Sequence, residues 1–319
     1  MAAPEDFAPV AVTARSGCDE SVHYGAVVGL GQNGDIELAI GDPRTTIYPR
    51  SSSKPMQAVA MVRAGLRLPP DSLAVVCASH DGTPKHLDVV RRILATAGLT
   101  EESLANVAAL PLDEEAAAAV LRAGGGRTRL QMNCSGKHSG MLVTSATNGW
   151  DLGARYLDVD HPLQRRITST IDELAGEEHT HIGVDGCGSP AHVFSLVGLA
   201  RAFRAIAAGE AGSAGEAVYG SMIAHPDLVG GDDRDVTKFM RWVPGLMAKD
   251  GADGVFAAAM PDGRAVAMKI ADGSDRARAP VMVAALRSLG IDVSVVEPLV
   301  VEPIMGHGER VGEVRAIAP

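Results

Sequence analysis

The sequence has few aromatic residues and an excess of acidic over basic side chains. Aromatic residues make up 3% of its 319 positions, and the formal net charge is −10. Nucleic-acid binding needs a basic surface and usually aromatic platforms, so this composition argues against it and favours a small neutral or cationic-headed ligand. Apolar residues make up 46% and charged residues 21%, which is typical of a globular protein and excludes a disordered or fibrous chain.

Long apolar runs are also missing. No stretch approaches the roughly eighteen unbroken apolar residues of a membrane helix. Glu5 and Asp6 lie where a signal peptide would carry positive charge, so we expect a cytoplasmic protein without a membrane partner. Cysteine is too scarce for a disulfide framework, and we expect free thiols. The four cysteines are Cys18, Cys77, Cys134 and Cys187.

Lysine is scarce, with six lysines against 23 arginines. Arginine can replace lysine wherever a surface charge suffices, but it cannot give up its proton and act as a base. Lys85 and Lys238 lie in otherwise polar helical stretches and are expected on the surface. The remaining lysines are candidates for chemistry that needs a neutral amine.

Strand signals concentrate near the two ends of the chain. Hairpins are predicted at residues 23–40, around Asn33-Gly34, and at 255–271, around Pro261-Asp262-Gly263, because these residues favour tight turns. A helix is expected at 280–289, and a further strand at 293–296. Leu73 to Ala78 is ambiguous between a strand and a buried connector.

Helical patterns dominate the middle of the chain. Apolar spacing, glycine stops and a proline in a first turn predict helices at residues 54–64, 85–97, 113–123, 162–174 and 191–208. Strands at both ends with helices between predict an α+β fold, with an antiparallel sheet of N- and C-terminal strands flanked by helices. We expect one domain over 1–319, with a sheet lobe at about 1–50 and 245–319 and a mainly helical lobe at about 51–244. A cleft between the lobes is the default ligand site.

Ser51 and Lys54 form a Ser-x-x-Lys motif at the expected start of a helix. A spacing of three puts both on one face, so a neutral Lys54 amine could take the proton of Ser51 as its hydroxyl attacks a carbonyl. Neutralising a lysine of pKa ~10.4 near pH 7 costs roughly 4 to 5 kcal/mol, which burial, a cationic neighbour and the helix N-terminus must supply. The motif is weak by itself, since a serine cap before a surface lysine has the same pattern.

Two glycine-rich clusters carry thiols beside other reactive groups. The segment 133–140 combines Cys134, Gly136, Lys137 and His138 just before an apolar helical run, where glycine permits close approach of a ligand and a helix N-terminus can bind an oxyanion. The alternative is a turn and helix cap.

The second cluster, 185–190, contains Asp185 and Cys187. Asp185 could hold a substrate ammonium or cap a helix. Cys134 and Cys187 lack Cys-x-x-Cys pairing, so their spacing gives poor support for zinc.

Two further segments bear on a serine mechanism. Ser79, His80 and Asp81 suggest a catalytic triad, but three consecutive side chains cannot adopt triad geometry in most backbones. Lys249 lies in a glycine-rich lead into the C-terminal hairpin, and Lys269 lies at the end of its second strand. A strand lysine opposite a serine nucleophile completes the sites of penicillin-recognising hydrolases, although Lys269 departs from their Lys-Thr-Gly pattern.

Taken in order, these motifs resemble the thermolabile, rhizobial-type L-asparaginase II family over almost the whole chain. The matching segments are Pro-Arg-Ser-Ser-x-Lys-Pro at 49–55, Cys-Ala-Ser-His at 77–80, Asn-Cys-Ser-Gly-Lys-His at 133–138, Asp-His-Pro-x-Gln at 160–164, Asp-Gly-Cys-Gly-x-Pro at 185–190, His-Pro at 225–226 and Lys-Asp-Gly-Ala-Asp-Gly at 249–254. A Ser-His-x-Gly motif at 21–25 is looser, because Val22 separates its serine and histidine. The chain does not resemble the asparaginases that use threonine nucleophiles.

The resemblance implies a fold similar to serine β-lactamases and glutaminases, and it implies roles for particular residues. It implies two serine–lysine pairs with the nucleophile on one of the two serines: Ser51 with Lys54, and Ser79 with Lys249. It implies substrate contacts from Arg50, Gly136, His138 and Asp185. It also implies a zinc site beside the catalytic centre, formed by Cys134, Lys137 and Cys187.

We therefore expect hydrolysis of the side-chain amide of L-asparagine to aspartate and ammonia through an acyl-enzyme. Ser51 attacks, Lys54 accepts its proton, backbone N–H groups stabilise the oxyanion, and Ser79 with Lys249 relays the proton to ammonia. One alternative is a hydrolase of glutamine, another amide or a β-lactam on the same scaffold; another is a non-catalytic protein that binds an amino acid or a metal. The resemblance suggests a homodimer.

Overall fold

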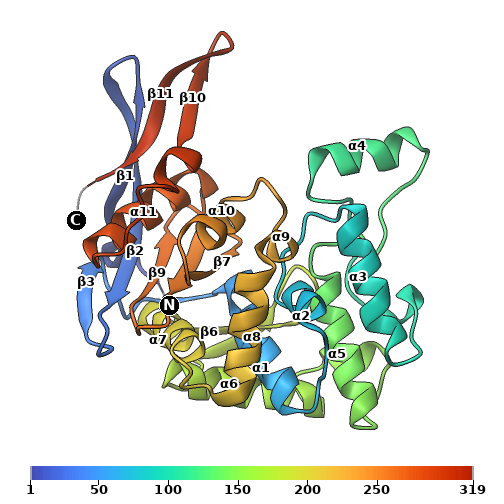
Figure 1. Ribbon diagram of the computed structural model, residues 1–319. Coiled ribbons are helices and arrows are strands. Elements are labelled where there is room, and N and C mark those ends of the chain that lie inside the picture. The colour runs from blue at the N-terminus through green and yellow to red at the C-terminus, as the bar shows by residue number, and fades with distance from the viewer. Residues whose placement is uncertain (1, 318–319) are drawn as a thin grey trace.

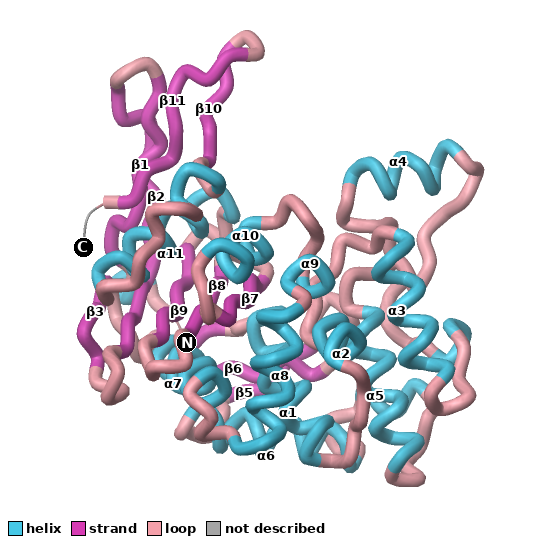
Figure 2. Tube along the Cα trace, viewed as in Figure 1, coloured by secondary structure: helices cyan, strands magenta, loops and turns pink. Residues whose placement is uncertain are grey.

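The computed structural model describes residues 2–317, and Figure 2 shows most of its strands gathered on one side and most of its helices on the other. Eight strands form one sheet: β1 (Ala8–Arg15), β2 (Cys18–Leu30), β3 (Ile36–Ile40), β7 (Met247–Gly251), β8 (Val255–Ala259), β9 (Ala265–Ile270), β10 (Glu302–Gly306) and β11 (Glu309–Ala316). Their order is β10-β11-β1-β2-β9-β8-β7, and β3 pairs with β2. All these pairings are antiparallel.

The N-terminal and C-terminal strands share this sheet. β1 pairs with β11, and β2 pairs with β9, so the predicted α+β fold is confirmed. Both predicted hairpins are confirmed as β2–β3 and β8–β9. The predicted helix at 280–289 is α11 (Arg278–Ser288).

The predicted strand at 293–296 is wrong. These residues form turns that lead into η6 (Glu297–Leu299). Val293 and Val296 are buried in the core, so the apolar run reflects a connector packed inward rather than a paired strand.

Ten helices lie between the two groups of strands: α1 (Lys54–Arg63), α2 (Pro70–Val76), α3 (Pro84–Ala95), α4 (Glu114–Arg122), α5 (Ser135–Thr147), α6 (Pro162–Ala175), α7 (Leu196–Ala207), α8 (Gly212–Ala224), α9 (Pro226–Val229) and α10 (Asp235–Trp242). The predicted helices at 54–64, 85–97, 113–123 and 162–174 are confirmed. The ambiguous run at 73–78 belongs mainly to α2. No helix within residues 2–317 has the length and apolar character needed to cross a membrane.

The predicted helix at 191–208 is wrong in its first part. Residues Pro190–Ser195 form β6, which joins β4 (Thr46–Ile47) and β5 (His181–Val184) in a small second sheet. Ser195 then starts α7, because its hydroxyl accepts the N–H of Gly198 as an N-cap. The apolar run at 191–208 therefore spans a strand and a helix.

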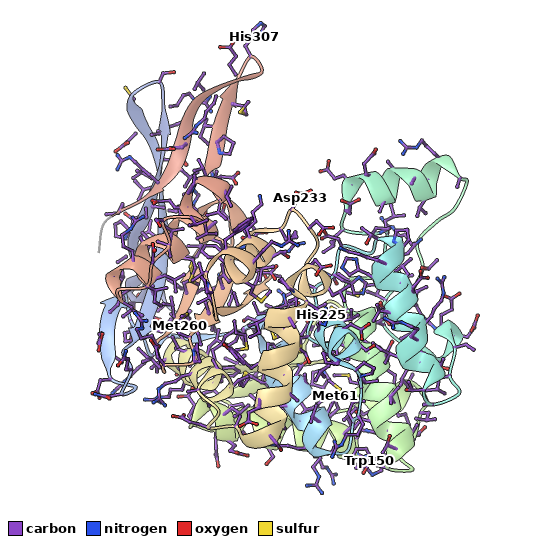
Figure 3. The ribbon with its side chains drawn as sticks, viewed as in Figure 1. Met61, Trp150, His225, Asp233, Met260 and His307 are labelled. Atoms are coloured by element: carbon purple, nitrogen blue, oxygen red, sulfur yellow. The ribbon has the colours of Figure 1, made fainter. Side chains whose placement is uncertain are left out.

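The main sheet is covered by helices, and the two lobes meet at its edge. α7 and α11 both contact β8 and β9, whose residues are nearly all buried. The edge strand β7 contacts α8, α10 and η2 (Arg50–Ser53). In Figure 1, the outer ends of β1–β2 and β10–β11 extend away from the helices, and Figure 3 places His307 at the tip of the β10–β11 hairpin. These arms lie far from the edge where the lobes meet.

Candidate active site

Ser79 lies in a buried polar cluster where the lobes meet. Its hydroxyl oxygen accepts hydrogen bonds from the amines of Lys54, at 3.1 Å, and Lys249, at 3.0 Å. Lys54 begins α1 and Lys249 lies in β7, and the two lysines are 1% and 0% exposed. Two buried amines therefore converge on one hydroxyl, and either can accept its proton when the amine is neutral.

The backbone around Ser79 is fixed on two sides. The N–H groups of Ser79 and Asp81 donate to the carbonyls of residues 229 and 230, at 3.0 and 2.9 Å. The ring of His80 instead bonds to the hydroxyl of Ser135, at 2.9 Å. No hydrogen bond within residues 2–317 joins the side chains of Ser79, His80 and Asp81 to one another. The three consecutive residues thus form no triad, as the sequence analysis expects.

Ser51 precedes Lys54 in the chain but does not bond to its amine. η2 carries Ser51 and runs into α1, where Pro55 fits the first turn because a first-turn N–H would have no partner. The backbone N–H of Lys54 donates to the carbonyl of Ser51, whereas its amine donates to the carbonyl of Ala78, at 2.6 Å, and to Ser79. The Ser51 hydroxyl is half-buried and makes no hydrogen bond within residues 2–317. A direct Ser51–Lys54 pair stays a prediction.

Lys249 is held by the residue that follows it. Its amine donates to the backbone carbonyl of Asp250, at 2.8 Å, and forms an ion pair with the carboxylate of the same residue. Burial lowers the pKa of Lys249 to about 8, with Asp250 opposing the shift and Lys54 adding to it. Roughly one Lys249 amine in ten is then neutral at pH 7, against about one in 2,500 for an ordinary lysine.

Arg234 binds Asp250 from the other side. Its guanidinium donates to Asp250, at 2.6 Å, and to Asp81, at 3.3 Å. Burial opposes ionisation of Asp250, but Lys249 and Arg234 hold the pKa of Asp250 well below its usual range. Burial raises the pKa of Asp81, and Arg234 counteracts this shift. Neither Arg234 nor Asp250 is predicted from the sequence to belong to the site. For Asp250, the position of a carboxylate within the fully buried strand β7 indicates a paired charge.

Three predicted zinc ligands lie in a second buried cluster. The amine of Lys137 is 3.1 Å from the sulfur of Cys187 and 2.9 Å from the hydroxyl of Ser189. A hydrogen bond from Cys134 lowers the pKa of Cys187, and Lys137 lowers it further. Burial opposes the charged form of Lys137, but Cys187 and Cys134 raise its pKa overall. Both shifts favour an ammonium on Lys137 beside a thiolate on Cys187.

His138 lies next to this cluster. Its Nδ1 is 2.7 Å from the hydroxyl of Tyr156, and its Nε2 is 3.4 Å from the hydroxyl of Ser189. Burial lowers the pKa of His138, so a neutral ring is favoured. The ring is fully buried, and its role in substrate binding stays a prediction.

Gly136 serves packing between helices. A Cβ added to Gly136 would lie 2.2 Å from the carbonyl oxygen of Val75 in α2. Glycine therefore lets α5 approach α2 closely and brings the start of α5 to the site. This packing does not test whether Gly136 contacts the substrate, so that contact stays a prediction.

Arg50 lies at the outer side of the site in a strained conformation. Its φ of 54° is in the left-handed region, which is costly for a residue with a Cβ. Its guanidinium donates to Asp185, at 2.8 Å, and forms an ion pair with Asp253. Arg50 therefore links the loop after β5 to the turn between β7 and β8, and Asp253 is a partner that the sequence analysis did not assign.

A small cavity connects the two clusters to Arg50. Its volume is about 10 Å³, which is roughly the space of one water molecule. Four predicted site residues line it: Arg50, Lys54, Lys137 and Asp185. A larger groove of about 510 Å³ between α11 and β11 contains none of the predicted site residues, so size does not identify the site here.

The remaining lysines lie outside these clusters. Lys85 forms ion pairs with Asp227 and Asp232 while 38% exposed. Lys269 donates to the carbonyl of Asp253, at 2.7 Å, rather than to a serine. The three lysines with buried amines at the site are Lys54, Lys137 and Lys249.

Comparison with known proteins identifies the family of the chain. A family model described as L-asparaginase II matches residues 11–316. No curated protein matches the sequence.

Similar solved structures have low sequence identity to the chain. A candidate beta-lactamase from Bacteroides dorei DSM 17855 is 15% identical with a TM-score of 0.48, covering 83% of this chain and 93% of that one. A beta-lactamase from Mycobacterium bovis is 15% identical with a TM-score of 0.39, covering 83% and 94%. A protein described as Mglu in its native form is 14% identical with a TM-score of 0.45, covering 82% of this chain but only 62% of its own length.

Proposed function

The chain belongs to the L-asparaginase II family, and from this premise we propose that it hydrolyses the side-chain amide of L-asparagine to L-aspartate and ammonia. One observation carries the proposal: the Ser79 hydroxyl lies between the buried amines of Lys54 and Lys249. Amide hydrolysis through an acyl-enzyme needs a nucleophilic hydroxyl, a proton acceptor and a proton donor for the leaving nitrogen. This cluster offers hydroxyl and amine groups in one hydrogen-bonded chain.

In the proposed reaction, Ser51 is the nucleophile and Ser79 passes protons. Ser79 is 3% exposed and already bonded to both amines, whereas Ser51 is half-buried and directly follows Arg50, which lines the cavity. Ser51 attacks the amide carbon as its proton goes to a neutral Lys54 amine. Lys54 then gives a proton to the Ser79 oxygen while Ser79 gives its own to Lys249, and the amide nitrogen takes one proton from this chain and leaves as ammonia.

Water completes the proposed cycle. It attacks the ester formed on Ser51, and its proton enters the same chain of amines and hydroxyl. The Ser51 oxygen recovers a proton as L-aspartate leaves, so the enzyme returns to its starting protonation state. Backbone N–H groups stabilise the oxyanion of both tetrahedral intermediates.

Arg50 and Asp185 are suited to bind the amino-acid end of the substrate. A guanidinium can bind an α-carboxylate through two hydrogen bonds, and a carboxylate can bind an α-ammonium. Their mutual ion pair keeps both charges compensated before substrate arrives. Because the cavity holds about 10 Å³, substrate entry requires this pair to separate.

Zinc is a proposed addition to the site. Cys134, Lys137 and Cys187 are all buried, and the Lys137 amine contacts a thiolate-prone sulfur. Two sulfurs and one nitrogen are a donor set that suits zinc, so the residues fit the metal. When bound, zinc would add positive charge beside the cavity and favour the neutral amine of Lys137. Within residues 2–317, no group of three or more His, Cys, Asp or Glu side chains is placed to hold a metal, so the proposed set depends on the Lys137 nitrogen as its third ligand.

An ammonia-release assay tests the proposed function. We expect a higher kcat/KM for L-asparagine than for L-glutamine, with L-glutamine and a β-lactam as comparison substrates. Lys54→Arg preserves charge but removes the base, so we expect a loss of about 10²- to 10⁴-fold. Lys85→Arg is the matched control, because Lys85 only forms surface ion pairs. Undiminished turnover by Lys54→Arg would contradict the mechanism, and stoichiometric asparagine binding without ammonia release would contradict the activity.

A further inference from the structure

Arg234 connects the two sides of the Ser79–Lys249 pair. Asp81 is two residues after Ser79, and Asp250 directly follows Lys249. One guanidinium bonds to both carboxylates, at 3.3 and 2.6 Å. We propose that Arg234 is a positioning residue that clamps Ser79 and Lys249 together by binding the carboxylate beside each of them. This inference rests on the proposed serine–lysine function.

The clamp differs from the surface ion pairs of this protein. The Asp250 side chain is 5% exposed, that of Asp81 is 11% exposed and that of Arg234 is 27% exposed. An exposed ion pair contributes little, whereas removing one partner of a buried pair leaves an uncompensated charge. Loss of Arg234 would leave two carboxylates next to the reacting pair without their shared cation.

The loop that carries Arg234 also fixes Asp81 sterically. Arg234 lies between α9 and α10, directly after Asp233, which Figure 3 labels on this loop. The Asp81 N–H donates to the carbonyl of Gly230. A Cβ added to Gly231 would lie 1.7 Å from the Asp81 carboxylate. The same loop thus contacts Asp81, in the segment that carries Ser79, through the carbonyl of Gly230, the close backbone of Gly231 and the guanidinium of Arg234.

Arg234 also affects the charge of Lys249. The guanidinium is a nearby cation, and it neutralises the Asp250 carboxylate that favours the Lys249 ammonium; both effects disfavour the charged amine. Removing Arg234 should therefore raise the pKa of Lys249 and reduce its neutral fraction at pH 7.

Other ionisable groups around Lys249 stay in place in such a variant. β8 contributes none, and Tyr219 of α8 bonds to the carbonyl of Gly245. The groups on or next to the surrounding elements are Arg50, Lys54, Cys77, Asp81, Glu216, Tyr219, Asp235, Lys238, Arg241, Asp250 and, near Asp250, Arg278.

Arg234→Gln is the main test, with Arg241→Gln as the matched control. Arg241 lies on α10, seven residues after Arg234, and pairs with the exposed Asp232, so its loss removes a surface ion pair without touching the site. We expect Arg234→Gln to shift the acidic limb of the kcat/KM profile upward by about one pH unit, with about a tenfold loss at pH 7. Arg234→Lys should restore part of the shift, because it restores the cation without the two-armed geometry.

Asp81→Asn separates positioning from charge. It removes the arm on the Ser79 side but leaves Arg234 and Asp250 paired. We expect a lower kcat. The acidic limb of the kcat/KM profile should stay within about 0.3 pH units of the wild type, because the Arg234–Asp250 pair beside Lys249 is intact. An equal limb shift in Asp81→Asn and Arg234→Gln would contradict the two separate roles.

The protonation of Lys249 can be measured without catalysis. Only six lysines are present, so the side-chain carbons of labelled lysines can be assigned by NMR with single Lys→Arg variants. We expect the Lys249 titration midpoint to rise in Arg234→Gln and to stay unchanged in Arg241→Gln. An unchanged midpoint together with an unshifted pH profile would overturn the clamp. If the wild type releases no ammonia while the midpoint still shifts, the proposed function fails and the electrostatic part of the inference stands.

Discussion

The pH dependence of ammonia release follows from the unusual environment of Lys249. Burial lowers the pKa of Lys249 to about 8, so the neutral fraction is roughly one tenth at pH 7, one half at pH 8 and nine tenths at pH 9. If the neutral amine is the active form, kcat/KM should rise about tenfold between pH 7 and pH 9. The direction is upward because the active amine is the deprotonated form.

The assay is a series of kcat/KM measurements from pH 6 to pH 9.5 at constant ionic strength, with wild type and Lys249→Arg. Arginine stays protonated over this range, so the limb with an apparent pKa of about 8 should disappear in the variant and activity should fall by about 10²- to 10⁴-fold. A wild-type profile that is flat from pH 6 to pH 9, or a Lys249→Arg variant with the same limb, would show that the neutral Lys249 amine is not required for the reaction.

Three further predictions concern packing, metal and hydrogen bonding. Gly136→Ala should lower the free energy of unfolding by about 1–3 kcal/mol in urea titrations, because its Cβ would meet the backbone of α2. The control is Gly220→Ala in α8, where a Cβ meets open space, and it should not lower the free energy of unfolding. Calorimetry should detect one zinc ion per chain, lost in Cys187→Ser and kept in the Cys18→Ser control, and absence of binding in the wild type would contradict the site. Tyr156→Phe should lower the free energy of unfolding by about 1–3 kcal/mol, because it leaves the buried Nδ1 of His138 unpaired. An unchanged midpoint in urea titrations would contradict this.

Local signals predicted much of the fold. Asn33-Gly34 and Pro261-Asp262-Gly263 indicate turns by backbone preference alone, and both hairpins form. The run at 191–208 does not show where its strand ends and its helix begins, because buried strand and helix residues are equally apolar. Only the pairing of β6 with β4 and β5 distinguishes its first five residues. That pairing depends on segments far away in the sequence.

Site residues that belong to a sequence motif could be predicted. Site residues whose role depends on contacts made only in the folded chain could not. Scarce lysine drew attention to Lys54 and Lys249, yet their shared contact is a serine 170 residues from Lys249. Ser-x-x-Lys spacing favoured a Ser51–Lys54 bond, whereas the amine of Lys54 extends to Ser79. Arg234 resembled any other arginine in the sequence, because its role arises from two aspartates that only folding brings to it.

The central claim is that a lysine-activated serine carries the acyl group during amide hydrolysis. Rapid mixing with L-asparagine, acid quenching and peptide mass spectrometry tests it directly. We expect a transient aspartyl ester on Ser51 that is absent in Ser51→Ala and accumulates more slowly in Lys54→Arg. No acylated peptide in an enzyme that turns over asparagine, or an ester that forms equally fast without the lysine amine, would contradict it.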